Sequence, residues 1–348
     1  MNPISGRLAG GAAFLALALA CNLDNAPVGP MPPAFHRASE ESSAPLVRHV
    51  VAPQATDPAI DKALDSHYAW LDTTARSNRK LFVFLPGTGQ NPAIFQLVQQ
   101  AAARLGYHVI GLMYPNAGGL AKVCPIDPDP NACYENARLE IIDGIDRSRV
   151  VDVNVANSID NRLTKLLRSL TLQYPDEGWD RFLLRGLPKW SQIAVSGHSQ
   201  GGGNAAMIAK VRVVARVVLF SSVTDSIHAA AASWVATHLT PSSRYYGIAH
   251  DRDGFYRPIR SGWDSLRLDV FGAPATPETS SPPYGGTHTL VTDLTPQGGF
   301  VGTNAHGAPS NDLNTPLGAD GAPLLRDAWR YLLTVRSAEQ EIANRDEE

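Results

Sequence analysis

The stretch Gln192-Ile-Ala-Val-Ser-Gly-His-Ser-Gln-Gly-Gly-Gly203 decides the fold class of this chain. Its first five residues form an apolar run typical of a buried strand, and residues 200–212 are a small-residue pattern that predicts a helix. Between them, Gly197, Ser199 and Gly201 match G-x-S-x-G, a turn so tight that its serine takes a strained backbone conformation. We therefore predict a strand–turn–helix corner with Ser199 at its tip, where helix N–H groups favour developing negative charge.

Other apolar runs along the chain predict more strands, interleaved with helices. Strands are predicted at residues 80–85, 107–114, 215–220, 245–250 and 288–294, and helices at residues 92–105, 158–172 and 323–335. Apolar strands that alternate with helices imply an α/β fold with a mostly parallel central sheet and helices on both faces. We assign residues 56–348 to a single domain of this kind.

Composition excludes several classes of protein. Hydrophobic residues make up 44% of the 348 residues and charged residues only 18%, so the chain is no disordered polyampholyte. The net charge is −3 and no basic stripe occurs, which argues against a nucleic-acid partner.

The N-terminus has the pattern of an export signal. Arg7 is followed by an apolar run at residues 8–20, which is too short to span a bilayer and fits the core of a signal peptide. The run ends Ala18-Leu-Ala-Cys21, which fits either ordinary signal cleavage or a lipoprotein signal that acylates Cys21 and anchors the chain to a membrane. Residues 1–21 are thus the predicted signal, and the Pro-, Ala- and Ser-rich residues 22–55 a predicted linker. The expected location is periplasmic, cell-surface or secreted.

Cysteine usage agrees with export. Apart from Cys21, the chain contains only Cys124 and Cys133, in a proline-rich segment that we predict to be a loop. In an oxidising compartment this pair would form a local disulfide. Two free thiols are the alternative, and a metal site is disfavoured because no histidine lies close in sequence.

These motifs resemble the α/β-hydrolase superfamily over residues 78–336, and most of all bacterial secreted serine esterases and lipases. The resemblance implies that Ser199 is a nucleophile and that the backbone N–H groups of Gln200 and Thr88 form an oxyanion hole. Pro86 stands where the family usually has histidine, which leaves Gly87 and Thr88 both open as the second donor.

The superfamily order of nucleophile, acid and base directs the search for the other two catalytic residues downstream. His250-x-x-Asp253 keeps the spacing of the family's Gly-x-x-Asp, which favours Asp253 as the acid over Asp251. His306 lies in a Gly- and Asn-rich loop before the last predicted helix, which favours it as the base. His288, at the start of a predicted strand, is the alternative.

The sequence therefore predicts an exported serine hydrolase that cleaves small-molecule or lipid carboxylic esters through an acyl-enzyme on Ser199. An acyltransferase on the same scaffold and a non-catalytic exported binding protein are the alternatives. The histidines show no metal-ligand clustering, so we expect neither a metal nor another cofactor. Four tryptophans are candidates to line an acyl pocket, although packing in the core is the commoner role for such residues: Trp179, Trp190, Trp234 and Trp263.

Overall fold

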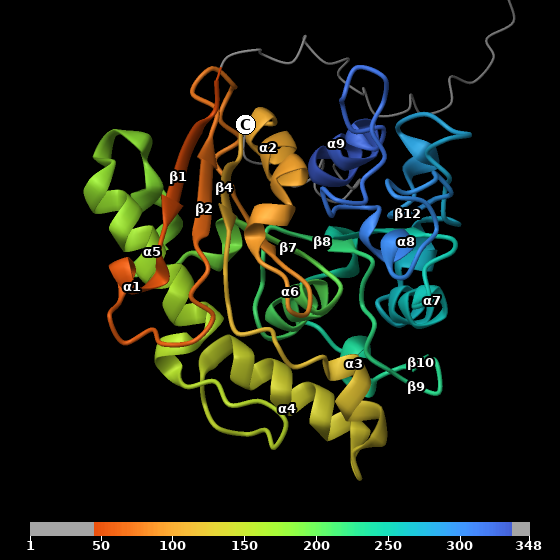
Figure 1. Ribbon diagram of the computed structural model, residues 1–348, viewed down its shortest axis with the longest axis horizontal. Helices are drawn as coiled ribbons and strands as arrows, with labels where there is room; N and C mark the ends of the chain where they lie inside the picture. The colour runs from red at the N-terminus through yellow and green to blue at the C-terminus, as the bar shows by residue number, and fades with distance from the viewer. Residues whose placement is uncertain (1–44, 336–348) are drawn as a thin grey trace, which may run out of the picture. The chain divides into compact units, whose positions relative to one another are not determined.

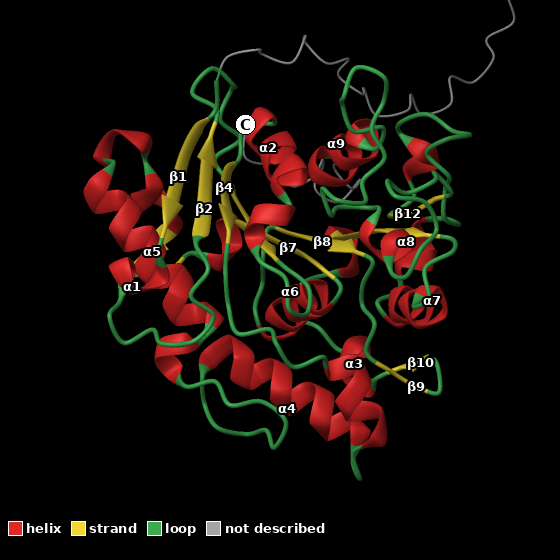
Figure 2. Ribbon diagram, in the orientation of Figure 1, coloured by secondary structure: helices red, strands yellow, loops and turns green. Residues whose placement is uncertain are grey.

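The computed structural model describes residues 45–335, which are built around an eight-stranded sheet (Figures 1 and 2). The strands occur in the order β1-β2-β4-β3-β7-β8-β11-β12. Their bounds are Val47–Val51 for β1, His67–Leu71 for β2, Leu81–Leu85 for β3, His108–Gly111 for β4, Ile193–His198 for β7, Arg216–Phe220 for β8, Tyr245–His250 for β11 and Thr289–Thr292 for β12. Two small hairpins lie outside it: β5 (Leu183–Leu184) with β6 (Leu187–Pro188), and β9 (Ser226–Ile227) with β10 (Ala230–Ala231).

The sheet is mostly parallel, with an antiparallel edge. β4, β3, β7, β8, β11 and β12 pair in parallel, whereas β1 pairs with β2, and β2 with β4, in antiparallel register. The predicted α/β fold class is confirmed. Strand β7, which leads into the serine corner, lies between β3 and β8, so segments that follow the carboxyl ends of its neighbours meet at that corner.

Helices cover both faces of the sheet. Their bounds are Pro53–Thr56 for α1, Gln96–Arg104 for α2, Leu120–Val123 for α3, Pro130–Asp143 for α4, Ile159–Gln173 for α5, Gln200–Val211 for α6, Tyr256–Ser265 for α7, Asn304–Gly307 for α8 and Arg326–Thr334 for α9. Figure 1 shows α2 and α9 on the side of the sheet away from α6.

The alternating side chains of β3 explain why the sheet has a hydrophobic core on each of its two faces. Leu81 and Val83 pack into one hydrophobic core, with residues of α4, α5, α6 and α7, whereas Phe82 and Phe84 pack into the other, with residues of α2 and α9. Because successive side chains of a strand point to opposite faces, a fully apolar run such as β3 serves both cores at once.

The structure corrects the end of the predicted linker. Val47–Val51 form the edge strand β1, so the predicted linker over residues 22–55 does not extend to residue 55. This strand alternates half-buried and exposed residues, a weak pattern in a short edge strand. The predicted signal, Cys21 and the rest of the linker up to residue 44 lie outside the described residues.

The loop expected around the two cysteines is also wrong in part, because Cys133 lies in the first turn of α4. The side chain of Asp129 caps that helix by accepting a hydrogen bond from the Ala132 N–H, Pro130 occupies the first helical position, and Gly144 ends the helix with a positive φ. These are ordinary helix signals, but the three prolines of the segment led to the prediction of a loop.

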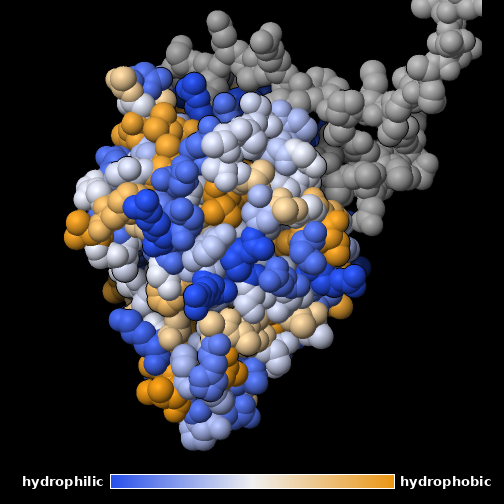
Figure 3. All heavy atoms as spheres, turned by 90° about the vertical axis from the view of Figure 1, so that its right-hand side faces the viewer, coloured by the Kyte–Doolittle hydropathy of each residue, from blue (hydrophilic) through white to orange (hydrophobic). Residues whose placement is uncertain are grey.

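Figure 3 shows the face on the side of α7 and β12, where hydrophilic and hydrophobic residues are interspersed. Among residues 45–335, no helix is long and apolar enough to cross a membrane.

Candidate active site

Ser199 lies at the sharp corner between β7 and α6. It is half-buried and has φ 52° and ψ −119°, a conformation that a residue with a side chain rarely adopts. Surrounding groups hold it there: its N–H donates to the Phe220 carbonyl (3.0 Å), and its carbonyl accepts from the Gly203 N–H (3.1 Å) and Ser222 Oγ (2.9 Å). The strained backbone is therefore fixed by three hydrogen bonds from two neighbouring elements.

The glycines around Ser199 are required by close backbone contact. A Cβ on Gly201 would lie 2.1 Å from the Leu85 carbonyl oxygen, and a Cβ on Gly197 would lie 2.4 Å from the carbonyl carbon of Gly201. Any side chain at these positions would push β3 and α6 apart. This is the steric reason for the spacing seen in the sequence.

Asp253 and His306 form a buried pair beside the corner. His306 Nδ1 lies 2.7 Å from Asp253 Oδ2, and the other carboxylate oxygen accepts from the Phe255 N–H at 2.8 Å. The buried His306 Nε2 has no hydrogen-bond partner among the described residues. Such a pair holds the ring with a proton on Nδ1 and leaves Nε2 available to accept another.

The two alternative residues lie elsewhere. His288 is stacked on Phe271, with ring centroids 3.7 Å apart, and its Nδ1 is bonded to the Tyr245 carbonyl (2.8 Å). Burial lowers the pKa of His288 to about 4, so it is neutral near pH 7. The Asp251 side chain is 43% exposed and contacts His250.

His198 supports the short helix α8, which carries His306. Its Nε2 donates to the His306 carbonyl (3.0 Å), and Ser221 Oγ donates to the same oxygen (2.7 Å). Burial, reinforced by the neighbouring His306, lowers the pKa of His198 to about 3. The neutral ring therefore acts as a fixed hydrogen-bond donor.

Ser199 and His306 line the same cavity, of about 250 Å³, together with Thr88 and Gln200. Ser199 Oγ forms no hydrogen bond with any described residue. Gly87 is absent from the lining, so of the two candidates left open by the sequence only Thr88 borders the cavity. The candidate tryptophans do not line it either: Trp179 and Trp263 are core residues.

Gln200 connects the corner to two other segments through its side chain. Gln200 Oε1 accepts from Thr88 Oγ1 (2.9 Å) and from the Leu120 N–H at the start of α3 (3.2 Å). Its own backbone N–H is the first of α6 and has no acceptor within that helix. The N–H of Thr88 likewise has no hydrogen-bond partner among the described residues. Two unpaired donors thus border the cavity that contains Ser199.

A buried ion pair contacts the backbone of Gln200. The guanidinium of Arg138 on α4 donates to both carboxylate oxygens of Asp225, to the Gln200 carbonyl (2.9 Å) and to Asn204 Oδ1 (2.7 Å). Both charged side chains are 1% exposed or less. A buried charge needs a partner, and Arg138 and Asp225 neutralise each other. The hydrogen bonds from Arg138 to Gln200 and Asn204 also fix the start of α6.

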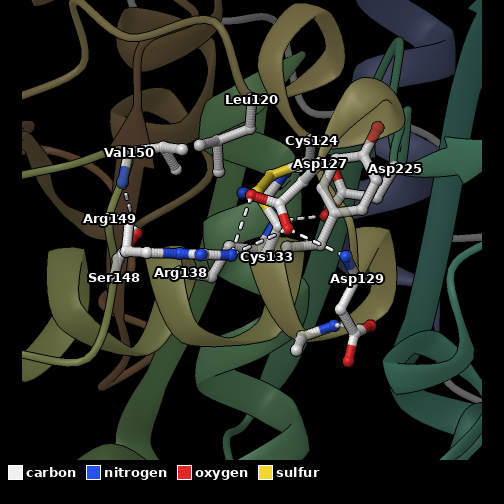
Figure 4. The surroundings of a disulfide bond; sticks show 12 residues. Leu120, Cys124, Asp127, Asp129, Cys133, Arg138, Ser148, Arg149, Val150 and Asp225 are labelled. Atoms are coloured by element: carbon white, nitrogen blue, oxygen red, sulfur yellow. Dashed lines mark hydrogen bonds and ion pairs between the residues drawn. A yellow bond between two sulfur atoms is a disulfide. The ribbon is translucent and has the colours of Figure 1, made fainter.

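Cys124 and Cys133 form a disulfide close to this pair (Figure 4). It joins the short turn after α3 to the first turn of α4, with the two Cα atoms 5.4 Å apart. Because α3 contacts the Gln200 side chain and α4 contacts its carbonyl, the disulfide ties together the two elements that hold Gln200.

Sequence reasoning missed Arg138, Asp225 and Ser222. None belongs to a motif, and Arg138 lies 87 residues from Asp225, so no local pattern indicates their contact. Among residues 45–335, no group of three His, Cys, Asp or Glu side chains is arranged to hold a metal ion.

Neither a scan against models of protein families nor a search of curated proteins finds a match to the chain. The side chains around Ser199 are therefore the basis for assigning a function.

Proposed function

We propose that this chain is a serine hydrolase of the α/β-hydrolase superfamily that cleaves carboxylic esters through an acyl-enzyme on Ser199. The observation that carries the proposal is the Asp253–His306 pair: His306 borders the same cavity as the strained Ser199, and its Nε2 has no hydrogen-bond partner among the described residues. The mostly parallel sheet and the serine corner directly after a central strand support membership of the superfamily. Ser199, Asp253 and His306 also follow its chain order of nucleophile, acid and base.

In the proposed reaction, Ser199 Oγ attacks the ester carbonyl carbon while its proton passes to His306 Nε2. Asp253 keeps the Nδ1 proton in place and stabilises the imidazolium that forms. The electron pair of the carbonyl moves to its oxygen, which accepts hydrogen bonds from the Gln200 and Thr88 N–H groups.

The alcohol then leaves with the proton that His306 returns, and Ser199 keeps the acyl group. Water attacks the acyl carbonyl, giving its proton to His306, and the acid is released as Ser199 recovers its proton. Each step uses only groups that border the cavity or support those that do.

We also propose that the chain is exported. The disulfide supports this, because such bonds persist mainly in oxidising compartments.

A fluorophosphonate probe tests the proposed nucleophile. We expect the folded protein to be labelled once, on Ser199, because only an activated serine attacks such a phosphorus centre at a useful rate. The adduct is located by mass spectrometry of peptides, which also separates Ser199 from Ser196 in the same stretch. No adduct, or an adduct on another serine, would contradict the proposal.

Ser222 offers a sharper test of the oxyanion hole. Its Oγ donates to the Ser199 carbonyl, which belongs to the same peptide group as the proposed Gln200 N–H donor, so it helps to fix the direction of that donor. We expect Ser222→Ala to lower kcat about five- to tenfold with little change in KM, since a neutral hydrogen bond contributes about 1 kcal/mol.

Ser196→Ala is the matched control for this variant. Ser196 is equally buried and its Oγ has no hydrogen-bond partner among the described residues, so its removal should leave kcat unchanged. Equal loss in both variants, or a loss confined to KM, would argue against a positioning role for Ser222.

A further inference from the structure

Most of the residues that line the cavity around Ser199 have polar or charged side chains. Among its described lining residues, only Leu120, Ala121 and Phe255 have side chains larger than glycine that are made wholly of hydrocarbon. Threonines, asparagines and glutamines provide most of the rest, and no lining residue is a carboxylate. A cavity of about 250 Å³ with such walls fits a short polar acyl group better than a long alkyl chain.

Lys122 gives the cavity an unbalanced positive charge. Two lining residues are permanently cationic, but Arg138 is neutralised by its buried pair with Asp225. Lys122, on α3, is exposed, and its ammonium forms no hydrogen bond or ion pair with any described residue. His198 adds no charge near pH 7, because burial lowers its pKa to about 3. An unpaired ammonium at the rim of a cavity attracts anions.

The position of Lys122 indicates which half of the ester it would meet. A Cβ built on Gly119 would lie 3.7 Å from Lys122 Cδ and 3.6 Å from Thr88 Cγ2, so the lysine stem and the Thr88 methyl both lie next to Gly119. The leaving alcohol must stay near His306, which protonates it. In the proposed reaction the acyl group would extend away from His306, toward the part of the cavity lined by Thr88 and α3.

We propose that the preferred substrates are esters of short dicarboxylic acids, in which one carboxyl is esterified and the other is a free carboxylate bound by Lys122. This inference rests on the proposed function, because it assumes that Ser199 is acylated. Ion pairing places the far carboxylate, and the cavity of about 250 Å³ limits the chain between it and the reacting carbonyl to a short one.

The test compares two esters of equal chain length, p-nitrophenyl hexanoate and mono-p-nitrophenyl adipate, which differ only in a terminal methyl or carboxylate. We expect the wild-type protein to have the higher kcat/KM for the adipate ester. Lys122→Gln should lower kcat/KM for the adipate ester about tenfold, which is about 1.4 kcal/mol. It should leave kcat/KM for the hexanoate ester unchanged. Lys122→Arg should retain the preference, and added salt should weaken it.

Lys189→Gln is the control. Because Lys189 does not line the cavity, this substitution should change kcat/KM for neither ester. A wild-type preference for hexanoate, or an equal loss of both activities in Lys122→Gln, would overturn the inference. If the fluorophosphonate labels Ser199 but neither ester is turned over, the substrate class is wrong and the nucleophile stands. If labelling and turnover both fail, the proposed function falls, and this inference falls with it.

Discussion

Replacing Ser199 with alanine is expected to lower kcat for p-nitrophenyl esters by about 10⁵-fold or more, to the level of weak residual catalysis. Without Oγ no acyl-enzyme can form, and only the N–H donors and substrate binding remain to assist water. A smaller loss would mean that another group attacks the ester.

The structure predicts that this loss is chemical and not a folding defect. Ser199 Oγ has no hydrogen-bond partner among the described residues, and the three bonds that hold the corner come from backbone atoms of Ser199. The variant should therefore keep the thermal unfolding temperature of the parent within a few degrees. Retention of a tenth or more of the activity would refute the proposed nucleophile, whatever the stability.

His306→Ala is expected to have an effect of similar size, because Ser199 would lose the group that accepts its proton. His288→Ala is the matched control, since it also removes a buried imidazole from the later part of the chain. It should leave ester turnover nearly unchanged, although the loss of the stack on Phe271 should lower stability by about 1–3 kcal/mol.

Initial rates and thermal unfolding, measured on both variants, separate the two effects. The assignment fails if His288→Ala abolishes turnover, or if His306→Ala retains it. His198 remains neutral in either background, because burial sets its low pKa, so it is not expected to take over as a base.

Much of the fold could be predicted because its central strands are short runs of buried hydrophobic residues. Each of the six predicted strands overlaps one of the parallel strands β3, β4, β7, β8, β11 and β12. The antiparallel strands β1 and β2 were missed, because polar residues such as Arg48 and His67 interrupt their apolar pattern and because β1, as the edge strand, needs fewer buried positions.

Part of the candidate site could likewise be predicted from the sequence, and part of it could not. Ser199 belongs to a motif whose local geometry explains its residues, and Asp253 and His306 were favoured from spacing and loop composition. The choice between His306 and His288 depends on a contact across 53 residues, which spacing alone does not indicate. Ser222 and Lys122 gave no sequence signal, because their contribution depends only on where the sheet and α3 place them.

The link between α3 and α4 has a practical consequence for producing this protein. A chain made in a glutathione-rich compartment would keep Cys124 and Cys133 as free thiols, and the helices on either side of Gln200 would be held only by their packing and hydrogen bonds. Preparations from a bacterial cytoplasm and from a periplasm could then differ in specific activity although their sequences are identical. Titration of free thiols should accompany any kinetic comparison.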